Sequence, residues 1–199
     1  MLAETATFEL VPSPVGHALA GFAVAWTAER ASGVRRAANW PAGIRARLKV
    51  AVWGLPAACA ILAFAPDLDI LLGSHRGPSH SIGGALIVAI LAAGVAVLLR
   101  LPVARTSAAC GISVASHVLL DWLGRDTSIP LGIQALWPVT TRYFYSSLDL
   151  FWDISRRYWL PREFILGNLG ALAHELVILA PLAAVAFYFR FASPGRKRG

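Results

Sequence analysis

Charged residues are scarce in this chain of 199 residues, where they make up 15% of the sequence against roughly 25% in an ordinary soluble domain. Hydrophobic residues make up 57%, and the mean hydropathy is +0.61. The few charges occupy short stretches between long apolar runs, which excludes the polar surface of a soluble globule. We therefore expect a membrane protein.

Cysteine and lysine are also nearly absent. The two cysteines, Cys59 and Cys110, both lie inside apolar runs, which excludes a disulfide framework and a metal site of the paired-cysteine kind. We interpret them as small buried residues. Almost all of the 18 basic residues are arginines, and the net charge of +7 would indicate nucleic acid in a soluble protein. In a membrane protein an excess of basic residues indicates which connections face the cytoplasm, so no nucleic-acid partner is expected.

The apolar runs predict an all-α integral membrane bundle, formed as a single domain over residues 1–199. The clearest run, Ile82 to Leu99, has no charge and nearly crosses a hydrocarbon core of about 30 Å. The first run begins with Ser13 and Pro14, an N-cap followed by a first-turn proline. We expect about five transmembrane helices, or four if the first lies shallow, near residues 13–28, 49–65, 81–99, 106–123 and 169–190.

The distribution of basic residues predicts the orientation. They are concentrated after the first helix, after the third helix and in the C-terminal tail, and the positive-inside rule places these segments in the cytoplasm. The first nine residues contain Glu4 and Glu9 but no lysine or arginine, so we expect no cleavable signal peptide. The prediction is a multi-pass membrane protein with the N-terminus outside and the C-terminus in the cytoplasm.

One long connection, residues 125–168, is rich in aromatic side chains, among them Trp137 and Trp152. This composition is typical of an aromatic belt at the depth of the lipid headgroups. The stretch from Tyr143 to Leu160 mixes rings with charges, as an interfacial amphipathic helix does. The alternative is a lid that packs on the helices and has no other role.

Ionisable side chains gather at the predicted outer ends of the helices, where each needs a partner or a function because a membrane makes it costly. His117 and Asp121 are four residues apart and share one helical face, about 6 Å apart at Cβ. The predicted topology brings the whole set to one membrane face. The set comprises His17, Asp67, Asp69, His75, His80, His117 and Asp121.

Imidazoles and carboxylates without thiolates favour a catalytic zinc ion, or two divalent ions sharing a carboxylate, over a closed structural site. Such ions lower the pKa of a coordinated water and polarise esters or phosphoesters, which indicates hydrolysis. Asp67 is either a ligand or a group that orients one, and it is also the least unsuitable general acid. Arg76 either holds an anionic group of the substrate or anchors the loop at the interface. The predicted ligands are His17, Asp69, His75, His80, His117 and Asp121.

Several of these residues lie in motifs that resemble the YdjM-like family of inner-membrane, LexA-regulated metal-dependent hydrolases. The motifs are Pro66-Asp67-Leu68-Asp69, the stretch from His75 to Ser81, His117 with Leu120-Asp121, and Gly132 with Trp137-Pro138. Their order is also similar, more distantly, to that of the zinc-dependent phospholipase C and single-strand nuclease superfamily. The resemblance implies a metal-dependent hydrolase, although no residues match the further ligands of the second superfamily.

We therefore expect a membrane-bound hydrolase that uses one or two divalent ions, zinc first, on an ester or phosphoester. Because the site is predicted at headgroup depth, a phospholipid is the first substrate to consider, with other lipids or small molecules next. Two non-enzymatic alternatives stay open. One is a regulatory or scaffolding membrane protein that binds metal to hold its loops, and the other is a metal or proton transporter, which would need polar groups across the whole bilayer.

Overall fold

The computed structural model describes residues 12–31, 54–72, 76–127, 129–155 and 159–191. Within these ranges the chain is helical, without a named strand, and it has two isolated β-bridges. The expected all-α class is confirmed. The elements are α1 (Pro14–Ala31), a helix at residues 54–64, the 3-10 helices η2 (Ala65–Leu72) and η3 (Pro78–His80), α3 (Ile82–Leu98), α4 (Val103–Leu123) and α5 (Pro161–Phe191).

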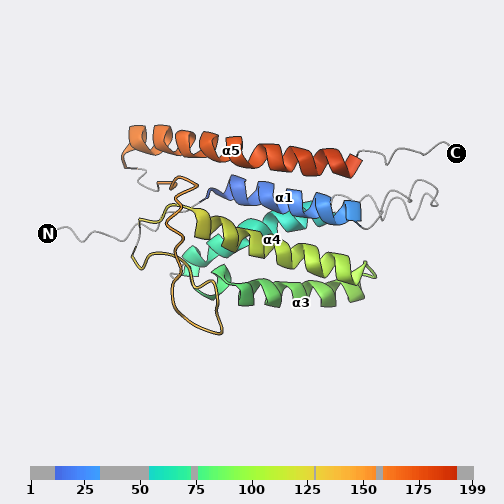
Figure 1. Cartoon of the computed structure of the whole chain (residues 1–199). Coiled ribbons are helices and arrows are strands. Elements are labelled where there is room, and N and C mark those ends of the chain that lie inside the picture. The colour runs from blue at the N-terminus through green and yellow to red at the C-terminus, as the bar shows by residue number, and fades with distance from the viewer. Residues whose placement is uncertain (1–11, 32–53, 73–75, 128, 156–158, 192–199) are drawn as a thin grey trace.

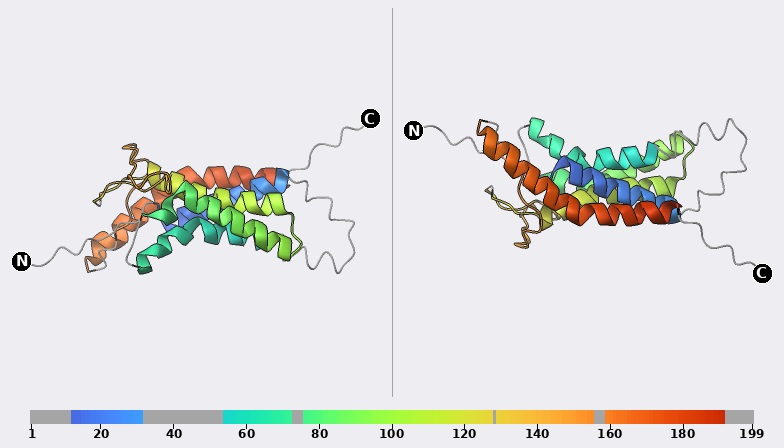
Figure 2. Two further views of the ribbon diagram at one scale, coloured as in Figure 1. Left: turned by 90° about the horizontal axis from the view of Figure 1, so that it is seen from below. Right: turned by 90° about the horizontal axis from the view of Figure 1, so that it is seen from above.

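The long helices lie side by side in an elongated bundle (Figure 1). Helix α1 packs against both α4 and α5, and α3 packs against α4. The connection at residues 124–155 gathers at one end of the bundle, where α1 begins and α4 ends, and Figure 2 shows it at the same end in two further views. We call this the loop end; α1 and α5 finish at the opposite end.

Three helical stretches are long and apolar enough to span a membrane by length and composition: Gly54–Leu71, Val103–Leu123 and Phe164–Phe191. Helix α3 is apolar but has only 17 residues. These four match expected spans. Helix α1 is less apolar than these candidate spans, because it carries polar groups such as His17 and Glu29. It nevertheless lies within the bundle, and both of these side chains are buried.

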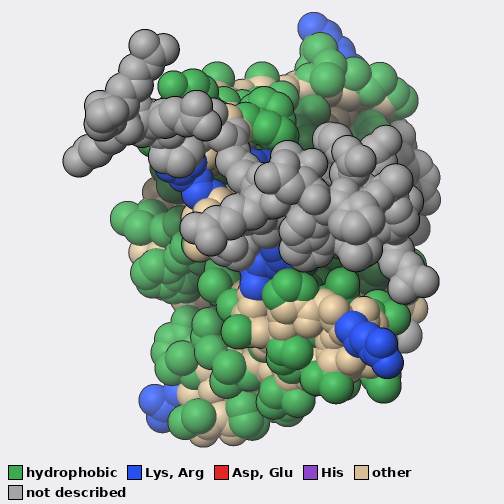
Figure 3. All heavy atoms as spheres, turned by 90° about the vertical axis from the view of Figure 1, so that its right-hand side faces the viewer, with side chains coloured by type: hydrophobic (Ala, Val, Ile, Leu, Met, Phe, Trp, Pro, Cys, Tyr) green, Lys and Arg blue, Asp and Glu red, His purple; other side chains and the backbone are tan. Residues whose placement is uncertain are grey.

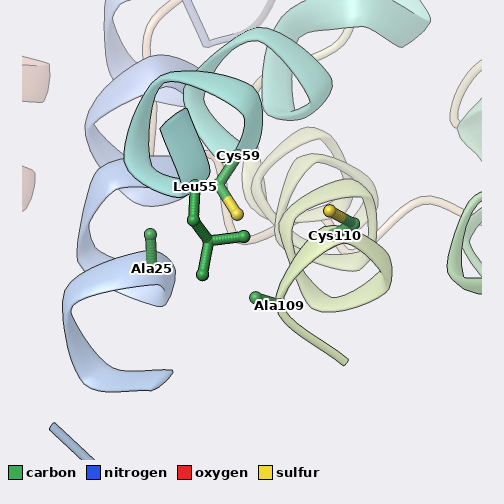
Figure 4. Close-up of a cluster of buried hydrophobic side chains, with 5 residues drawn as sticks. All are labelled: Ala25, Leu55, Cys59, Ala109 and Cys110. Carbon is green, nitrogen blue, oxygen red and sulfur yellow. The ribbon is translucent and has the colours of Figure 1, made fainter. Parts of the chain in front are cut away.

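Small residues let these helices approach closely, which is typical of packing between membrane helices. A Cβ on Gly21 of α1 would lie 2.4 Å from the carbonyl oxygen of Cys59. Figure 4 shows the small core beside this crossing, in which Cys59 and Cys110 point toward one another from the helix at residues 54–64 and from α4. Both cysteines are free and buried, as expected.

The aromatic connection departs from the sequence prediction in two ways. Residues 143–155 form no helix, so the interfacial amphipathic helix predicted from Tyr143 to Leu160 is wrong over its described part. Helix α5 begins at Pro161, eight residues before the predicted start at 169, because Pro161 is well suited to a first helical turn and no second proline follows before 169. The predicted interfacial segment therefore ends earlier than residue 168.

The connection instead packs on the loop end through backbone bonds and one buried ring. The amide of Ile82 donates to the carbonyl of Ala135 at 2.9 Å, and that of Gly83 donates to Trp137 at 3.1 Å. Phe151 is 1% exposed and packs in a cluster with Leu120 and Leu179. The connection is thus a lid over the helix ends, and it holds the start of α3 in place.

Candidate metal centre

Four side chains from three elements converge at the loop end. Asp67 comes from η2, His80 from η3, and His117 and Asp121 from α4. Each offers one nitrogen or oxygen atom, and these four atoms lie within 4.8 Å of one another. On α4 the predicted shared face is confirmed, because His117 Nε2 lies 3.2 Å from Asp121 Oδ2.

His17 on α1 joins the cluster, and its ring stacks on that of His117 with 3.9 Å between the ring centres. Its Nε2 lies 3.2 Å from Oδ1 of Asp121 and 4.0 Å from Oδ2 of Asp67. The other oxygens, Oδ2 of Asp121 and Oδ1 of Asp67, lie 3.2–3.8 Å from Nε2 of His80 and His117. Each carboxylate therefore faces His17 with one oxygen and the other two imidazoles with its second oxygen.

The start of α1 is held in position by α5. Ser13 caps α1 by accepting from the amide of Gly16 at 3.2 Å, which confirms the predicted N-cap. Glu175 of α5 accepts a hydrogen bond from the Ser13 amide at 2.5 Å and another from the Ser13 hydroxyl. A Cβ on Gly16 would lie 2.7 Å from the Glu175 carboxylate, so only glycine leaves room for this contact. Glu175 thus fixes the first turn of α1, which carries His17.

The ring of His117 is oriented by a backbone carbonyl. Its Nδ1 donates to the carbonyl oxygen of Ala63 at 2.7 Å, so Nε2 is the nitrogen that faces the carboxylates. The carbonyl of Ala63 is available because the helix tightens to a 3-10 helix from Ala65, and Pro66 has no amide hydrogen to donate to it. This arrangement is the usual one for a metal-binding histidine.

His80 has a carboxylate behind its ring. Asp69 Oδ2 lies 3.2 Å from His80 Nδ1 and accepts a hydrogen bond from the Ser79 hydroxyl at 2.5 Å. Burial lowers the pKa of His80, but the hydrogen bonds to Asp67 and Asp69 and the charge of Asp121 outweigh it and raise that pKa to about 9. Asp67 thus belongs to the four-residue group, whereas Asp69 lies outside it, behind the ring of His80.

The cluster is buried and incompletely hydrogen-bonded. The side chains of His17, His80 and His117 are 0% exposed, and that of Asp121 is 9% exposed. Nε2 of His17 and of His117 and one oxygen each of Asp67 and Asp121 make no hydrogen bond. Buried polar atoms of this kind are costly, and a cation among them would satisfy them together. The residues therefore fit a divalent ion with nitrogen and oxygen ligands.

Arg76 lies near this cluster in an ion pair. Its Nη1 lies 2.5 Å from Oδ1 of Asp126, and Oδ2 of Asp126 accepts from the amide of Gly132 at 2.5 Å. The carbonyl of Arg76 accepts from the amide of Gln134 at 3.1 Å. Arg76 is 7% exposed and has a backbone φ of 66°. The ion pair thus ties the segment before η3 to the lid.

The structure unites most of the predicted site. His17, Asp67, His80, His117 and Asp121 come together, whereas His75 lies outside the described residues. Sequence reasoning gave too little weight to Glu175 and Asp126. The signal for Glu175 was its position inside an apolar run, where an ionisable residue needs a partner.

Comparison with known proteins identifies a family. A family model described as YdjM inner membrane protein matches residues 13–193, which is most of the chain. The matched region includes every residue of the cluster. No curated protein and no solved structure matches the chain.

Proposed function

The chain belongs to the YdjM inner membrane protein family, and we propose that it is a metal-dependent hydrolase of an ester or phosphoester. The observation that carries this proposal is the buried convergence of three imidazoles and two carboxylates, in which Nε2 of His17, Nε2 of His117 and one oxygen of each carboxylate make no hydrogen bond. A purely structural cluster of buried groups is normally satisfied internally.

The donor set favours zinc among the common divalent ions, since two of the four grouped ligand atoms are imidazole nitrogens and none is a thiolate. His80, His117, Asp67 and Asp121 would hold the first ion. When bound, zinc supplies Lewis acidity and a water of lowered pKa. His17, which lies 3.2 Å from Asp121 and 4.0 Å from Asp67, would supply a further imidazole nitrogen to this ion or to a second one.

The residues around the cluster prepare it for that role. Ala63 and Asp69 set the orientations of His117 and His80 from behind, which holds Nε2 of both rings toward the two carboxylates. Glu175 holds the first turn of α1 and so positions His17. Arg76, four residues before His80 in the sequence and paired with Asp126, is the residue we assign to an anionic group of the substrate.

The place of the cluster favours a substrate from the bilayer. Asp121 lies near the last residue of α4, a candidate span, and this position supports a site at the depth of lipid headgroups. The aromatic lid, which includes Trp137 and Trp152, lies at the same end. A phospholipid is therefore our first choice. We further propose that this end faces the outside of the inner membrane, because the opposite end carries the concentration of arginines.

The proposal is tested with protein purified in detergent without added metal. Elemental analysis should find zinc, and fluorogenic phosphodiesters or phospholipids should be hydrolysed in a chelator-sensitive manner. His117→Ala should lose both metal and turnover, whereas Asp149→Asn, on an exposed part of the lid, should lose neither. Metal without turnover in the wild type would support a scaffold instead. Metal flux into proteoliposomes would support a transporter.

A further inference from the structure

A second buried charged group lies at the end of the bundle opposite the lid. Arg190 of α5 donates from Nε to Oε2 of Glu29 on α1 at 2.7 Å, and both side chains are less than a tenth exposed. Arg105 of α4 also acts on Glu29 through its charge. Three helices are thus joined by charges at this end, about 24 Å along α4 from Asp121 at ~1.5 Å per residue.

A cavity of about 970 Å³ opens beside this group, between α1, α4 and α5. Its walls are almost wholly apolar and include Ala108, Ile112 and Val185. The charged residues in its lining are Arg30 and Arg105. A volume near the upper end of the ~300–1,000 Å³ range of ligand pockets accommodates a long apolar chain.

Arg30 is held at the margin of the cavity by α5. Its Nη1 donates to the carbonyl oxygen of Phe189 at 2.8 Å, and its guanidinium carbon lies 5.8 Å from the centre of the Phe189 ring. Phe189 itself lines the cavity. The apolar walls and the two guanidinium groups therefore belong to one continuous surface, which matches an amphiphile with an anionic head.

The charge of this end is strongly one-sided. The sequence has no aspartate or glutamate in residues 30–66, 70–120 or 176–199, so Glu29 is the carboxylate available to Arg30, Arg105 and Arg190. In Figure 3, which looks onto this end, basic side chains lie among apolar ones, and no acidic side chain is visible where described atoms form the surface. The charged side chains of segments 32–53 and 192–199 are all basic in the sequence.

We propose that this cavity binds an anionic phospholipid of the leaflet opposite the metal centre. Its acyl chain lies against the alanine- and valine-rich walls, and its phosphate lies between Arg30 and Arg105. Basic pockets between membrane helices are typical sites for anionic headgroups, and guanidinium groups bind phosphate by paired hydrogen bonds. The site is separate from the proposed hydrolase centre and does not depend on its activity.

The test compares lipids retained by the full-length protein. Detergent-purified protein is incubated with phosphatidylglycerol or phosphatidylcholine of the same acyl chains, and bound lipid is counted by native mass spectrometry. Phosphatidylglycerol should be preferred, and the double variant Arg30→Gln, Arg105→Gln should weaken its binding about tenfold or more, since each arginine is worth roughly fivefold. Arg100→Gln, a basic residue at the same end but outside the cavity lining, should leave binding unchanged.

A second variant tests the apolar part of the site without touching the charges. Ala186→Phe fills the cavity from α5 and should reduce binding of both lipids. Circular dichroism and gel filtration check that each variant is folded. Equal retention of the two lipids by the wild type would overturn the proposal, as would wild-type binding by the double variant. Competition by inorganic phosphate as effective as by phosphatidylglycerol would also overturn it, since it would show a simple anion site.

Discussion

His17 of α1 lies 3.2 Å from Asp121 of α4, and the same carboxylate lies 3.2 Å from His117 through its other oxygen. Asp121 therefore contacts all three imidazoles of the cluster, and each of these distances is shorter than the corresponding distance to Asp67. Asp121 thus links the histidine of α1 to the histidine of its own helix, α4. Replacing Asp121 should accordingly disturb more of the proposed site than replacing any single imidazole.

Asp121→Asn is expected to lose at least half of the bound metal. The amide keeps the size of the side chain but removes the negative charge and one good ligand oxygen. Metal content per chain, measured by elemental analysis after gel filtration, gives the answer. Asp149→Asn is the matched control, since Asp149 is an exposed lid residue with a φ of 49°, a conformation that asparagine tolerates. Equal metal loss in the two variants would show that the metal site extends into the lid.

Asp67 and Asp69 should respond differently to the same substitution. Asp67→Asn removes a residue of the four-membered group and should lower the metal content at saturation. Asp69→Asn removes the carboxylate behind His80 and should weaken metal affinity about 10- to 100-fold while the saturated content stays constant. A metal titration of both variants separates affinity from content. If Asp69→Asn lowered the saturated content and Asp67→Asn did not, Asp69 would be the ligand and Asp67 the orienting group.

Metal affinity should rise as the pH is raised toward about 9. The pKa of His80 is raised to about 9 in the metal-free protein, so a proton occupies this imidazole at neutral pH. A metal ion that binds there must displace the proton, and the displacement becomes easier as the pH rises. Affinity measured by competition with a chelator of known pH dependence checks this. An affinity that is constant from pH 6 to pH 9 would show that His80 is not a ligand.

Gly21→Ala should destabilise the bundle by about 1–3 kcal/mol, the usual cost of forcing extra atoms into a packed interior. Its Cβ would lie 2.4 Å from the backbone oxygen of Cys59, and backbone atoms cannot rotate away. Gly94→Ala is the control, because a Cβ there meets nothing within 4 Å and favours the helix by up to about 1 kcal/mol. Thermal unfolding in detergent compares them. Equal melting temperatures would mean that α1 and the helix at residues 54–64 are further apart.

The Gly21→Ala variant also tests whether close packing of the helices is needed for metal binding. Helix α1 carries His17, and the helix at residues 54–64 leads directly into η2, which carries Asp67. Separating the two helices at Gly21 should therefore move His17 away from Asp67 and weaken metal binding as well as stability. Gly94→Ala should leave metal binding unchanged, since Gly94 is exposed on α3 and far along that helix from η3.

Much of the site could be predicted because it depends on local spacing. His117 and Asp121 share a face on any helix, and the order of apolar runs brings the remaining polar residues to one end of the bundle. The different positions of Asp67, inside the four-residue group, and Asp69, behind His80, could not be predicted. It depends on the change from an α-helix to a 3-10 helix at Ala65, which alters the direction of each later side chain.

The sequence by itself determined that this is a membrane protein, that its fold is helical, and at which end of the bundle the ionisable groups gather. These follow from the length of the apolar runs and the position of each polar residue along them, which no folding can change. Only the tertiary structure decided that Glu175 holds α1, that Arg76 pairs with Asp126, and that Arg30 and Arg105 border one cavity. Each of these contacts joins segments far apart in the chain, and it is the packing of small residues between helices that sets their distance.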